Sequence, residues 1–285
     1  MVDEFPQVPG VEHRYVDAGG LRMHVAEAGE GEPVLALHGW PQHWYLWRHV
    51  IPRLGPHARV IAPDLRGFGW SGVPAGGYDK ETMARDVLTL LHALGLERVR
   101  LIGHDWGAWI GFLICLHQRE RVERFVACNI VPPWPSRDPR APLDLWRLSY
   151  QAALSLPRLG GAFGRRFARL GLASTRALSD AEIDAFAGRL GGERGRATEL
   201  LYRTFLLRET VPLVRGRYRA ADLEVPTLLL FGDRDQVIPL RTVRAAAAQS
   251  AAVELEAVPG ASHFVVDERP ELVAGRALRF FGLDS

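Results

Sequence analysis

Three polar side chains that could do chemistry, Asp105, Asp235 and His263, each follow an apolar run of the chain. Asp105 lies in VRLIGHDWGAW (99–109), where a short apolar run ends in glycine and a helix-like apolar stretch follows. A turn of this kind between a strand and a helix usually carries a serine nucleophile at the middle position. The carboxylate found there instead predicts covalent catalysis with Asp105 as the attacking group.

The identity of this nucleophile restricts the kind of carbon that it can attack. Attack on an ester or amide carbonyl would form an anhydride, whereas attack on a saturated carbon with a leaving group forms an alkyl ester. Water can then hydrolyse this ester, if His263 deprotonates the water and Asp235 orients the histidine and makes it more basic. The three residues therefore predict displacement at carbon, with an epoxide or an alkyl halide as substrate.

The elements that must position these residues alternate between strands and helices. Short β-rich runs are predicted as strands, and apolar residues at i, i+4, i+7, i+8 and i+11 from Met83 to Leu94 predict an amphipathic helix. Such alternation is typical of a mostly parallel sheet flanked by helices, with chemistry at the carboxyl ends of the strands. The predicted strands lie in HRYVDAGGLRMHVAEAG (two, around Gly-Gly), EPVLALHG, ARVIAPD, VRLIG, VPTLLLFG and AVELEAVPG, and PELVAGRALRFFG is a final amphipathic segment.

The middle of the chain has a different texture. A proline-rich connection, VPPWPSRDPRAP, is followed by Arg-, Leu- and Ala-rich sequence with helical spacing and glycine breaks. We therefore expect a helical lid over residues 134–220, inserted between a first core part (1–133) and a second core part (221–285) of one α/β domain.

The chain resembles the epoxide hydrolases of the α/β-hydrolase fold, over nearly its whole length. The order nucleophile, acid, histidine is the order of this fold. The resemblance implies a mostly parallel central sheet with an inserted helical lid, an epoxide and water as substrates, and no cofactor. Five motifs carry it in order: HGWP, PDLRGFGWSG (63–72), GHDWGA (103–108), FGDRDQVIP (231–239) and GASHF (260–264).

The same resemblance assigns further roles. The backbone N–H groups of Trp40 and Trp106 are expected to form the oxyanion hole. Asp233 competes with Asp235 as the acid, and Asp235 is favoured because family members carry the acid three residues after the glycine that corresponds to Gly232.

Two lid tyrosines are expected to donate hydrogen bonds to the epoxide oxygen. Ring opening generates an alkoxide, and a phenol with a pKa of about 10 stays protonated near neutral pH and can supply a proton. The family carries one tyrosine in a Tyr-Gln pair, matched by Tyr150, and one in a Tyr-Arg pair. Tyr202 and Tyr218 both fit the second pair, and Tyr202 is favoured because Tyr218 lies close to the return into the sheet.

A haloalkane dehalogenase is the main alternative, because it shares the aspartate nucleophile and the tryptophan after it, here Trp106. One dehalogenase subgroup has asparagine after HG, where this chain has Trp40, and fluoroacetate dehalogenases favour arginine after the nucleophile. A binding module without catalysis is less favoured, since it would not need Asp105, Asp235 and His263 together.

Composition narrows the remaining possibilities. The net charge is +2 without a dense basic block, and the arginines of GRRFAR (164–169) are interpreted as a solvated face, so no nucleic-acid partner is expected.

The N-terminus has no export signal and no apolar stretch is long enough to span a membrane, so we expect a cytoplasmic protein without a membrane partner. Cys115 and Cys128 lie in apolar runs, as buried reduced thiols do, and the histidines show no metal-ligand spacing. The pattern does not predict the oligomeric state.

Overall fold

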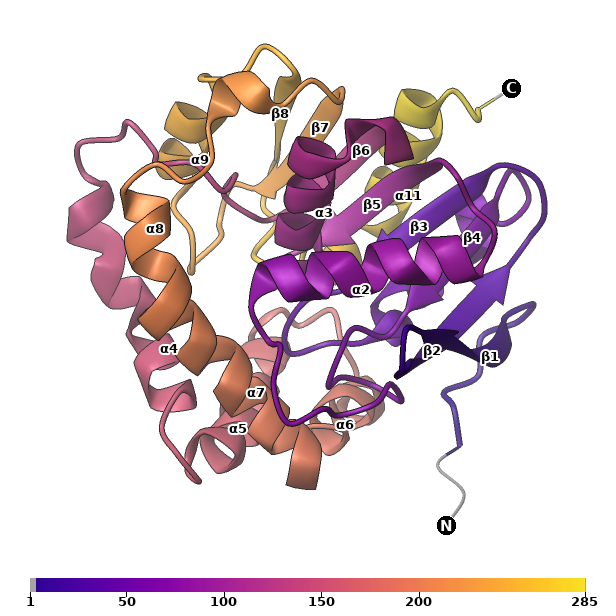
Figure 1. The fold of residues 1–285 in the computed structure, drawn as a ribbon, viewed down its shortest axis with the longest axis horizontal. Coiled ribbons are helices and arrows are strands. Elements are labelled where there is room, and N and C mark those ends of the chain that lie inside the picture. Colours follow the sequence, from indigo (N-terminus) through magenta and orange to yellow (C-terminus); the bar gives the residue numbers. More distant parts are fainter. Residues whose placement is uncertain (1–3, 285) are drawn as a thin grey trace.

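An eight-stranded sheet forms the centre of the protein in a computed structural model that describes residues 4–284, without the side chains of Pro142 and Leu145 (Figure 1). The strand order is β1-β2-β4-β3-β5-β6-β7-β8; β2 pairs antiparallel with β1 and β4, and the other pairs are parallel. The predicted mostly parallel sheet is therefore confirmed. The strands are β1 (Glu12–Ala18), β2 (Leu21–Ala28), β3 (Pro33–Leu37), β4 (Arg59–Pro63), β5 (Val99–His104), β6 (Val122–Cys128), β7 (Thr227–Gly232) and β8 (Val253–Val258).

Helices cover both faces of this sheet. In Figure 1, α2 and α3 cross in front of the sheet and α11 lies behind it. The predicted amphipathic helix is α2, whose Met83, Val87, Leu90 and Leu91 are buried against the front face, as their spacing requires. The helices of the core are α1 (Ile51–Leu54), α2 (Lys80–Ala93), α3 (Trp106–His117), α9 (Leu240–Ala247), α10 (Val265–Glu268) and α11 (Pro270–Phe281), with short 3-10 helices η1 (Trp44–His49) and η2 (Arg119–Arg121).

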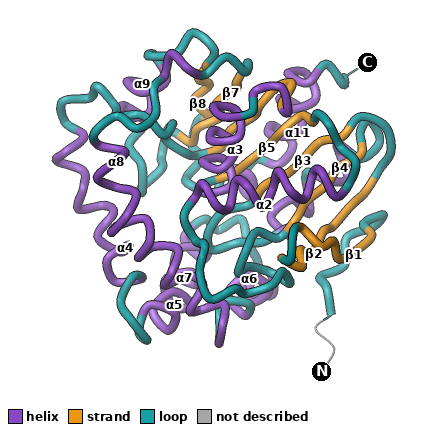
Figure 2. The backbone as a smooth tube through the Cα atoms, viewed as in Figure 1, coloured by secondary structure: helices purple, strands orange, loops and turns teal. Residues whose placement is uncertain are grey.

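A helical segment separates β6 from β7. Between Cys128 and Thr227, helix is the only regular structure that the described residues form. These helices gather at one side of the molecule, away from most of the strands (Figure 2). They are η3 (Ala141–Leu148), α4 (Ser149–Leu154), α5 (Gly160–Ser174), α6 (Asp180–Gly188), α7 (Gly192–Thr204), the π-helix η4 (Phe205–Glu209), α8 (Thr210–Val214) and η5 (Ala220–Asp222).

Parallel pairing brings the predicted chemical residues to one edge of the sheet. Asp105 follows β5 directly, Asp235 lies three residues beyond β7, and His263 follows β8 by five residues. Because β5 and β7 run parallel on either side of β6, and β8 runs parallel beside β7, their carboxyl ends point the same way. The topology thus gathers residues that lie up to 158 positions apart in the sequence.

Cys115 and Cys128 are buried and unpaired, as expected from their apolar surroundings. Among residues 4–284, no helix combines the length and the apolar character that crossing a bilayer requires.

Candidate active site

Asp105 occupies a strained turn between β5 and α3. Its φ of 49° lies in the left-handed region that non-glycine residues rarely adopt, and such strain marks functional turns. Glycines make the turn possible by letting the backbones approach. A Cβ on Gly107 would lie 2.3 Å from the Leu37 carbonyl oxygen, and one on Gly39 would lie 2.5 Å from the Asp105 side chain. The surrounding backbone therefore holds the Asp105 carboxylate in one place.

The two oxygens of the Asp105 carboxylate have different neighbours. Oδ2 accepts a hydrogen bond of 2.9 Å from the backbone N–H of Trp40, and Oδ1 lies 3.7 Å from Nε2 of His263. Trp106 is the first residue of α3, so its N–H is among the first-turn donors that have no acceptor within the helix. Of the two expected oxyanion-hole donors, the Trp40 N–H contacts the carboxylate, and the Trp106 N–H belongs to the residue that follows Asp105 in the chain.

His263 is held on its other side by a buried carboxylate. Its Nδ1 lies 2.8 Å from Oδ2 of Asp235, while Oδ1 of Asp235 accepts from the backbone N–H groups of Val237 and Ile238 at 2.7 and 2.9 Å. The amide of Asn129 also donates to Oδ2 at 2.9 Å. These contacts fix Asp235 so that it orients the imidazole with Nε2 toward Asp105.

The charges of this group support one another. Burial alone would lower the pKa of His263, but the carboxylates of Asp235 and Asp105 outweigh it and raise this pKa to about 10. Burial would raise the pKa of Asp235, but its contacts with His263 outweigh that effect and the pKa is lowered. At neutral pH the imidazole is therefore cationic, with the side chains of Asp235 and Asp105 on either side of it.

The rival acid, Asp233, lies outside this group. Its side chain is exposed, and its Oδ1 accepts from the backbone N–H of Gly260 at 2.8 Å. This contact stabilises the turn after β8. Of the two aspartates in FGDRDQVIP, the structure pairs Asp235 with His263.

Tyr150 and Tyr202 lie side by side over Asp105. Their ring centroids are 6.0 Å apart, and the Tyr202 hydroxyl accepts a long hydrogen bond of 3.5 Å from the Trp106 indole. Burial raises the pKa of both phenols, and the nearby Asp105 carboxylate raises it further. Both side chains therefore keep their protons at neutral pH.

Arg203, the arginine of the Tyr-Arg pair, links two helices. It donates to the carbonyl of Ser155 at the end of α4 at 3.1 Å and pairs with Glu199 on its own helix. This contact ties α7, which carries Tyr202, to the end of α4, which carries Tyr150.

Tyr218 faces a different surface. Its hydroxyl contacts Glu81 on α2, beside His117 at the end of α3. It lines neither of the cavities at Asp105. Of the two tyrosines that fit the Tyr-Arg pattern, Tyr202 is the one beside Asp105.

Two cavities of about 190 and 220 Å³ meet at Asp105. Asp105, Tyr150 and Val237 line both, so the nucleophile and one phenol lie where the cavities adjoin. Trp106, Ile130 and Phe205 are among the residues that line only the smaller one, and Tyr202, His263 and Phe167 are among those that line only the larger. Apolar walls with a few converging polar groups are typical of a small-molecule site.

Comparison with known proteins identifies the family. The alpha/beta hydrolase fold family matches residues 32–270. The soluble epoxide hydrolase of Corynebacterium sp. (strain C12) is 32% identical over 95% of this chain and 97% of its own length. The chain belongs to the α/β-hydrolase family.

Solved structures of this family agree with the assignment. Epoxide hydrolase CorEH without ligand superimposes with a TM-score of 0.79 at 31% identity, covering 95% of this chain and 99% of its own. Epoxide hydrolase VrEH1 from Vigna radiata gives a TM-score of 0.81 at 26% identity, covering 96% and 98%. This α/β-hydrolase is thus similar to epoxide hydrolases over almost its whole length.

Lys80, the only lysine of this α/β-hydrolase, is a residue that the sequence pattern did not single out. It is fully buried, and its ammonium lies 4.4 Å from the centre of the Trp106 ring and 3.2 Å from Glu209 on η4. Burial lowers its pKa, against the attraction of Glu209. A charged residue at the first position of an amphipathic helix gives no sign of such burial in the sequence.

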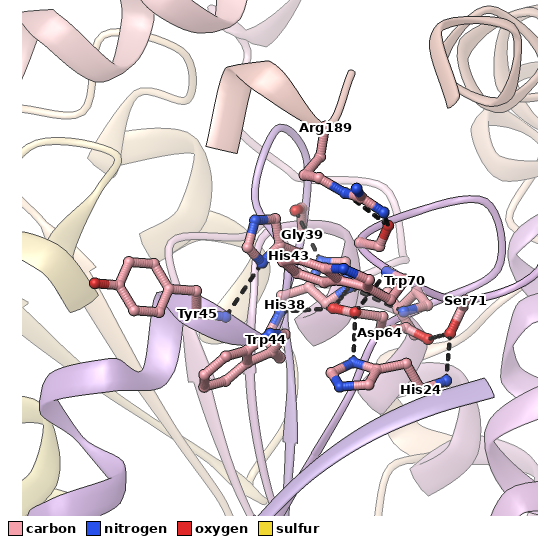
Figure 3. A network of polar contacts seen from close by, with 12 residues as sticks. His24, His38, Gly39, His43, Trp44, Tyr45, Asp64, Trp70, Ser71 and Arg189 are labelled. Carbon is pink, nitrogen blue, oxygen red and sulfur yellow. Dashed lines mark hydrogen bonds and ion pairs between the residues drawn. The ribbon is translucent and has the colours of Figure 1, made fainter. Parts of the chain in front are cut away.

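A buried polar network supports the Trp40 side of the hydrolase site (Figure 3). His38 contacts the Gly39 carbonyl through Nδ1 at 3.1 Å, and its Nε2 accepts from the backbone N–H of Leu65 at 2.9 Å, so it bonds to backbone as expected. Asp64 accepts from the backbone N–H groups of Trp44 and Trp70, both at 2.8 Å. The network holds the loop that presents the Trp40 N–H.

Three other residues of the hydrolase sequence are placed by the structure. His104 is a packing residue, as expected: it is buried and contacts the carbonyl of His263 at 2.8 Å. Trp146 and Phe163, which the sequence suggests as tunnel residues, line neither cavity at Asp105 and have exposed fractions of 67% and 41%.

Proposed function

We propose that this α/β-hydrolase is an epoxide hydrolase, which converts an epoxide into a vicinal diol through an ester on Asp105. One observation carries the proposal: a carboxylate at the nucleophile turn faces two protonated phenols, Tyr150 and Tyr202, beside apolar cavities. The similarity to proteins named epoxide hydrolases supports it.

In the first step, Oδ1 of Asp105 attacks one carbon of the epoxide. Oδ2 is already held by the Trp40 N–H at 2.9 Å, which leaves Oδ1 as the oxygen that forms the new bond. The carbon–oxygen bond of the ring breaks, and the oxygen leaves as an alkoxide that takes a proton from a phenol. Tyr150 and Tyr202 supply this donor pair.

In the second step, water hydrolyses the ester. His263, oriented by Asp235, takes a proton from water as the water attacks the carbonyl carbon of Asp105. Oδ2 then carries the negative charge of the tetrahedral intermediate, and the N–H groups of Trp40 and Trp106 stabilise it. Collapse breaks the bond between the carbonyl carbon and the substrate oxygen, and this oxygen takes the second proton of the water, so that the diol leaves, Asp105 is again a carboxylate and His263 is again protonated.

Ester formation itself prepares the base. The charged Asp105 is one of the groups that raise the pKa of His263 to about 10. Once Asp105 is an uncharged ester, that attraction is lost, the pKa of His263 falls, and the imidazole can release its proton to restore the phenol. A neutral histidine is then ready to accept a proton from water.

Residues 134–220 form a lid over the core parts 1–133 and 221–285 in this proposal. Contacts between lid and core support the division: the Trp40 indole donates to Thr198 at 3.2 Å and the Trp106 indole to Tyr202 at 3.5 Å. The lid thereby places its phenols opposite the nucleophile and excludes water from the first step.

The same indole contacts weigh against a haloalkane dehalogenase. A halide leaving group needs only N–H donors, and in this site the indole N–H groups of Trp40 and Trp106 instead donate to the hydroxyls of Thr198 and Tyr202. Two phenols beside the nucleophile suit an alkoxide instead.

A paired assay tests the proposed function. Purified enzyme is given styrene oxide and, separately, a short bromoalkane, and diol and bromide are measured, with Asp105→Asn as the inactive control. The proposal predicts diol without bromide. Bromide without diol would show that the protein is a dehalogenase. The absence of both products would favour a binding module.

A further inference from the structure

The lid carries an uneven distribution of charge that the proposed reaction does not use. Residues 145–179 contain six arginines and no acidic residue, whereas the whole chain has a net charge of only +2. The guanidinium groups of Arg165 and Arg166 make no hydrogen bond or ion pair with any residue that the structure describes, and both are exposed. This cationic segment is centred on α5, at the lower edge of the molecule in Figure 1.

Large apolar side chains share the exposed surface of α5. Phe163, Phe167 and Leu170 have exposed fractions of 41%, 42% and 64%, and Leu159, just before the helix, has 53%. At 100° per residue, Phe163, Phe167 and Leu170 form one stripe. Arg165, Arg166 and Arg169 form the adjacent stripe, and the buried side of the helix is made by Gly160, Gly164, Ala168 and Leu172.

One residue of the apolar stripe, Phe167, also lines the cavity at Asp105. Phe167, Gly171 and Ser174 of α5 line the cavity of about 220 Å³ that contains Asp105 and His263. A molecule that covers the stripe would therefore contact the Phe167 side of that cavity.

The sequence alone led us to expect a solvated face here and no membrane partner, but the exposed apolar stripe beside the arginines changes this interpretation. We propose that the exposed face of α5, defined by Phe163, Arg165, Arg166, Phe167 and Leu170, docks on an anionic phospholipid surface. A helix with apolar and arginine stripes side by side matches the interface of such a surface, where rings enter the acyl boundary and guanidinium groups meet phosphates. Lipophilic epoxides dissolved in the lipid would then enter the site directly. Only this last consequence rests on the proposed function.

A second copy of this chain fits the face less well. A two-fold dimer brings the same patch of each subunit together. It would place Arg165 and Arg166 of one copy near the same residues of the other. Their like charges would repel, because residues 145–179 contain no acidic side chain that could pair with them. An anionic surface is complementary to the same charges.

Vesicle co-sedimentation tests the docking. Full-length protein is mixed with vesicles of phosphatidylcholine alone or with 30% phosphatidylglycerol. We expect binding to the anionic vesicles that weakens as salt is raised, and little binding to phosphatidylcholine. Arg165→Ala/Arg166→Ala should weaken binding about 25-fold, since each arginine contributes about fivefold near such a surface. Phe163→Ala/Leu170→Ala should weaken it by about tenfold or more.

The matched control is Arg244→Ala/Arg279→Ala, which removes two exposed arginines from α9 and α11. It should bind like the unaltered protein. Equal losses in both arginine pairs, or no binding of the unaltered protein to anionic vesicles, would overturn the proposal. So would a dimer in light scattering that Phe163→Ala/Leu170→Ala dissolves, because α5 would then be a subunit interface.

The activity of the same variants separates this proposal from the proposed function. On styrene oxide in solution, Arg165→Ala/Arg166→Ala should match the unaltered protein. On an epoxide carried in anionic vesicles, its rate should fall in proportion to the lost binding. Failure of the proposed function would instead show as no diol from the unaltered protein in either setting, with vesicle binding intact.

Discussion

His263 lies between two carboxylates with different tasks. Asp235 is buried and held by three donors, and it keeps its charge throughout. In the proposed mechanism, Asp105 would lose its charge when it is alkylated. On this proposal, the histidine is cationic before the first step and can act as a base after it, because the charge of Asp105 changes and that of Asp235 does not.

Replacing His263 separates the two steps. His263→Gln should still form the ester, since Asp105 and both phenols remain, but it should not hydrolyse the ester. We expect one equivalent of styrene oxide to be consumed and multiple turnover to fall by about 10⁴-fold or more. Mass spectrometry of the peptide with Asp105 should show the added substrate. Normal multiple turnover of His263→Gln would contradict the two-step scheme.

The pKa of His263 also makes a prediction for stability. A folded pKa of about 10, above the ordinary 6.5, favours the folded state fully below pH 6.5, and this contribution is lost as the pH rises to 10. The difference in free energy of unfolding between the unaltered protein and His263→Gln should therefore shrink between pH 6.5 and 10. Urea unfolding across this range measures it, and a constant difference would show that the imidazole is not cationic in the folded protein.

The tyrosines give a matched pair of variants. Tyr202→Phe should slow ester formation, and Tyr150→Phe/Tyr202→Phe should slow it by about 10²-fold or more, because proton donation to the alkoxide is lost. Tyr218→Phe loses a contact with Glu81 away from both cavities and should leave the rate unchanged. Single-turnover kinetics of the three variants distinguish the roles of the tyrosines. Slow ester formation in Tyr218→Phe with a normal rate in Tyr202→Phe would mean that Tyr218, not Tyr202, is the second donor.

At the scale of elements, the strand, turn and helix around Asp105 could be predicted because their causes are local. A short apolar run indicates β5, a helix-like apolar stretch indicates α3, and Gly103 and Gly107 lie where the backbones approach closely. The choice between Tyr202 and Tyr218 is different, because both lie in the lid segment and precede arginine. Which of them faces Asp105 depends on how the lid docks, and no pattern within a helix encodes that.

Lys80 and Glu209 show how that docking is secured. They join α2 of the core to η4 of the lid behind Trp106, in a pair where the lysine is fully buried. Lys80→Met should leave Glu209 without its partner and lower the free energy of unfolding by about 3 kcal/mol, as breaking a buried pair does. Lys80→Met/Glu209→Gln should be less destabilised, because the unpaired charge is removed as well. Denaturant unfolding compares them, and equal stability of Lys80→Met and the unaltered protein would contradict a structural role for the pair.

At the scale of the whole molecule, the mostly parallel sheet and the meeting of Asp105, Asp235 and His263 at one edge of it could be anticipated, because each of these residues follows its own strand. Individual contacts between residues that lie far apart in the sequence could not be anticipated. Asn129 reaches Asp235 across 106 positions, and Thr198 reaches Trp40 across 158, because β6 adjoins β7 and because α7 packs on the HGWP loop. Such contacts arise only from the assembled fold, and they hold both acid and oxyanion loop in place.

The central claim is that Asp105, not water, attacks the substrate carbon. A single turnover of styrene oxide with excess enzyme in H₂¹⁸O tests it directly. Hydrolysis of the Asp105 ester at its carbonyl leaves the aspartate oxygen in the diol and puts the water oxygen into the carboxylate. We predict unlabelled diol and ¹⁸O in the peptide that contains Asp105. Diol that carries ¹⁸O in the first turnover, with an unlabelled peptide, would show that water attacks the epoxide directly and would contradict the account.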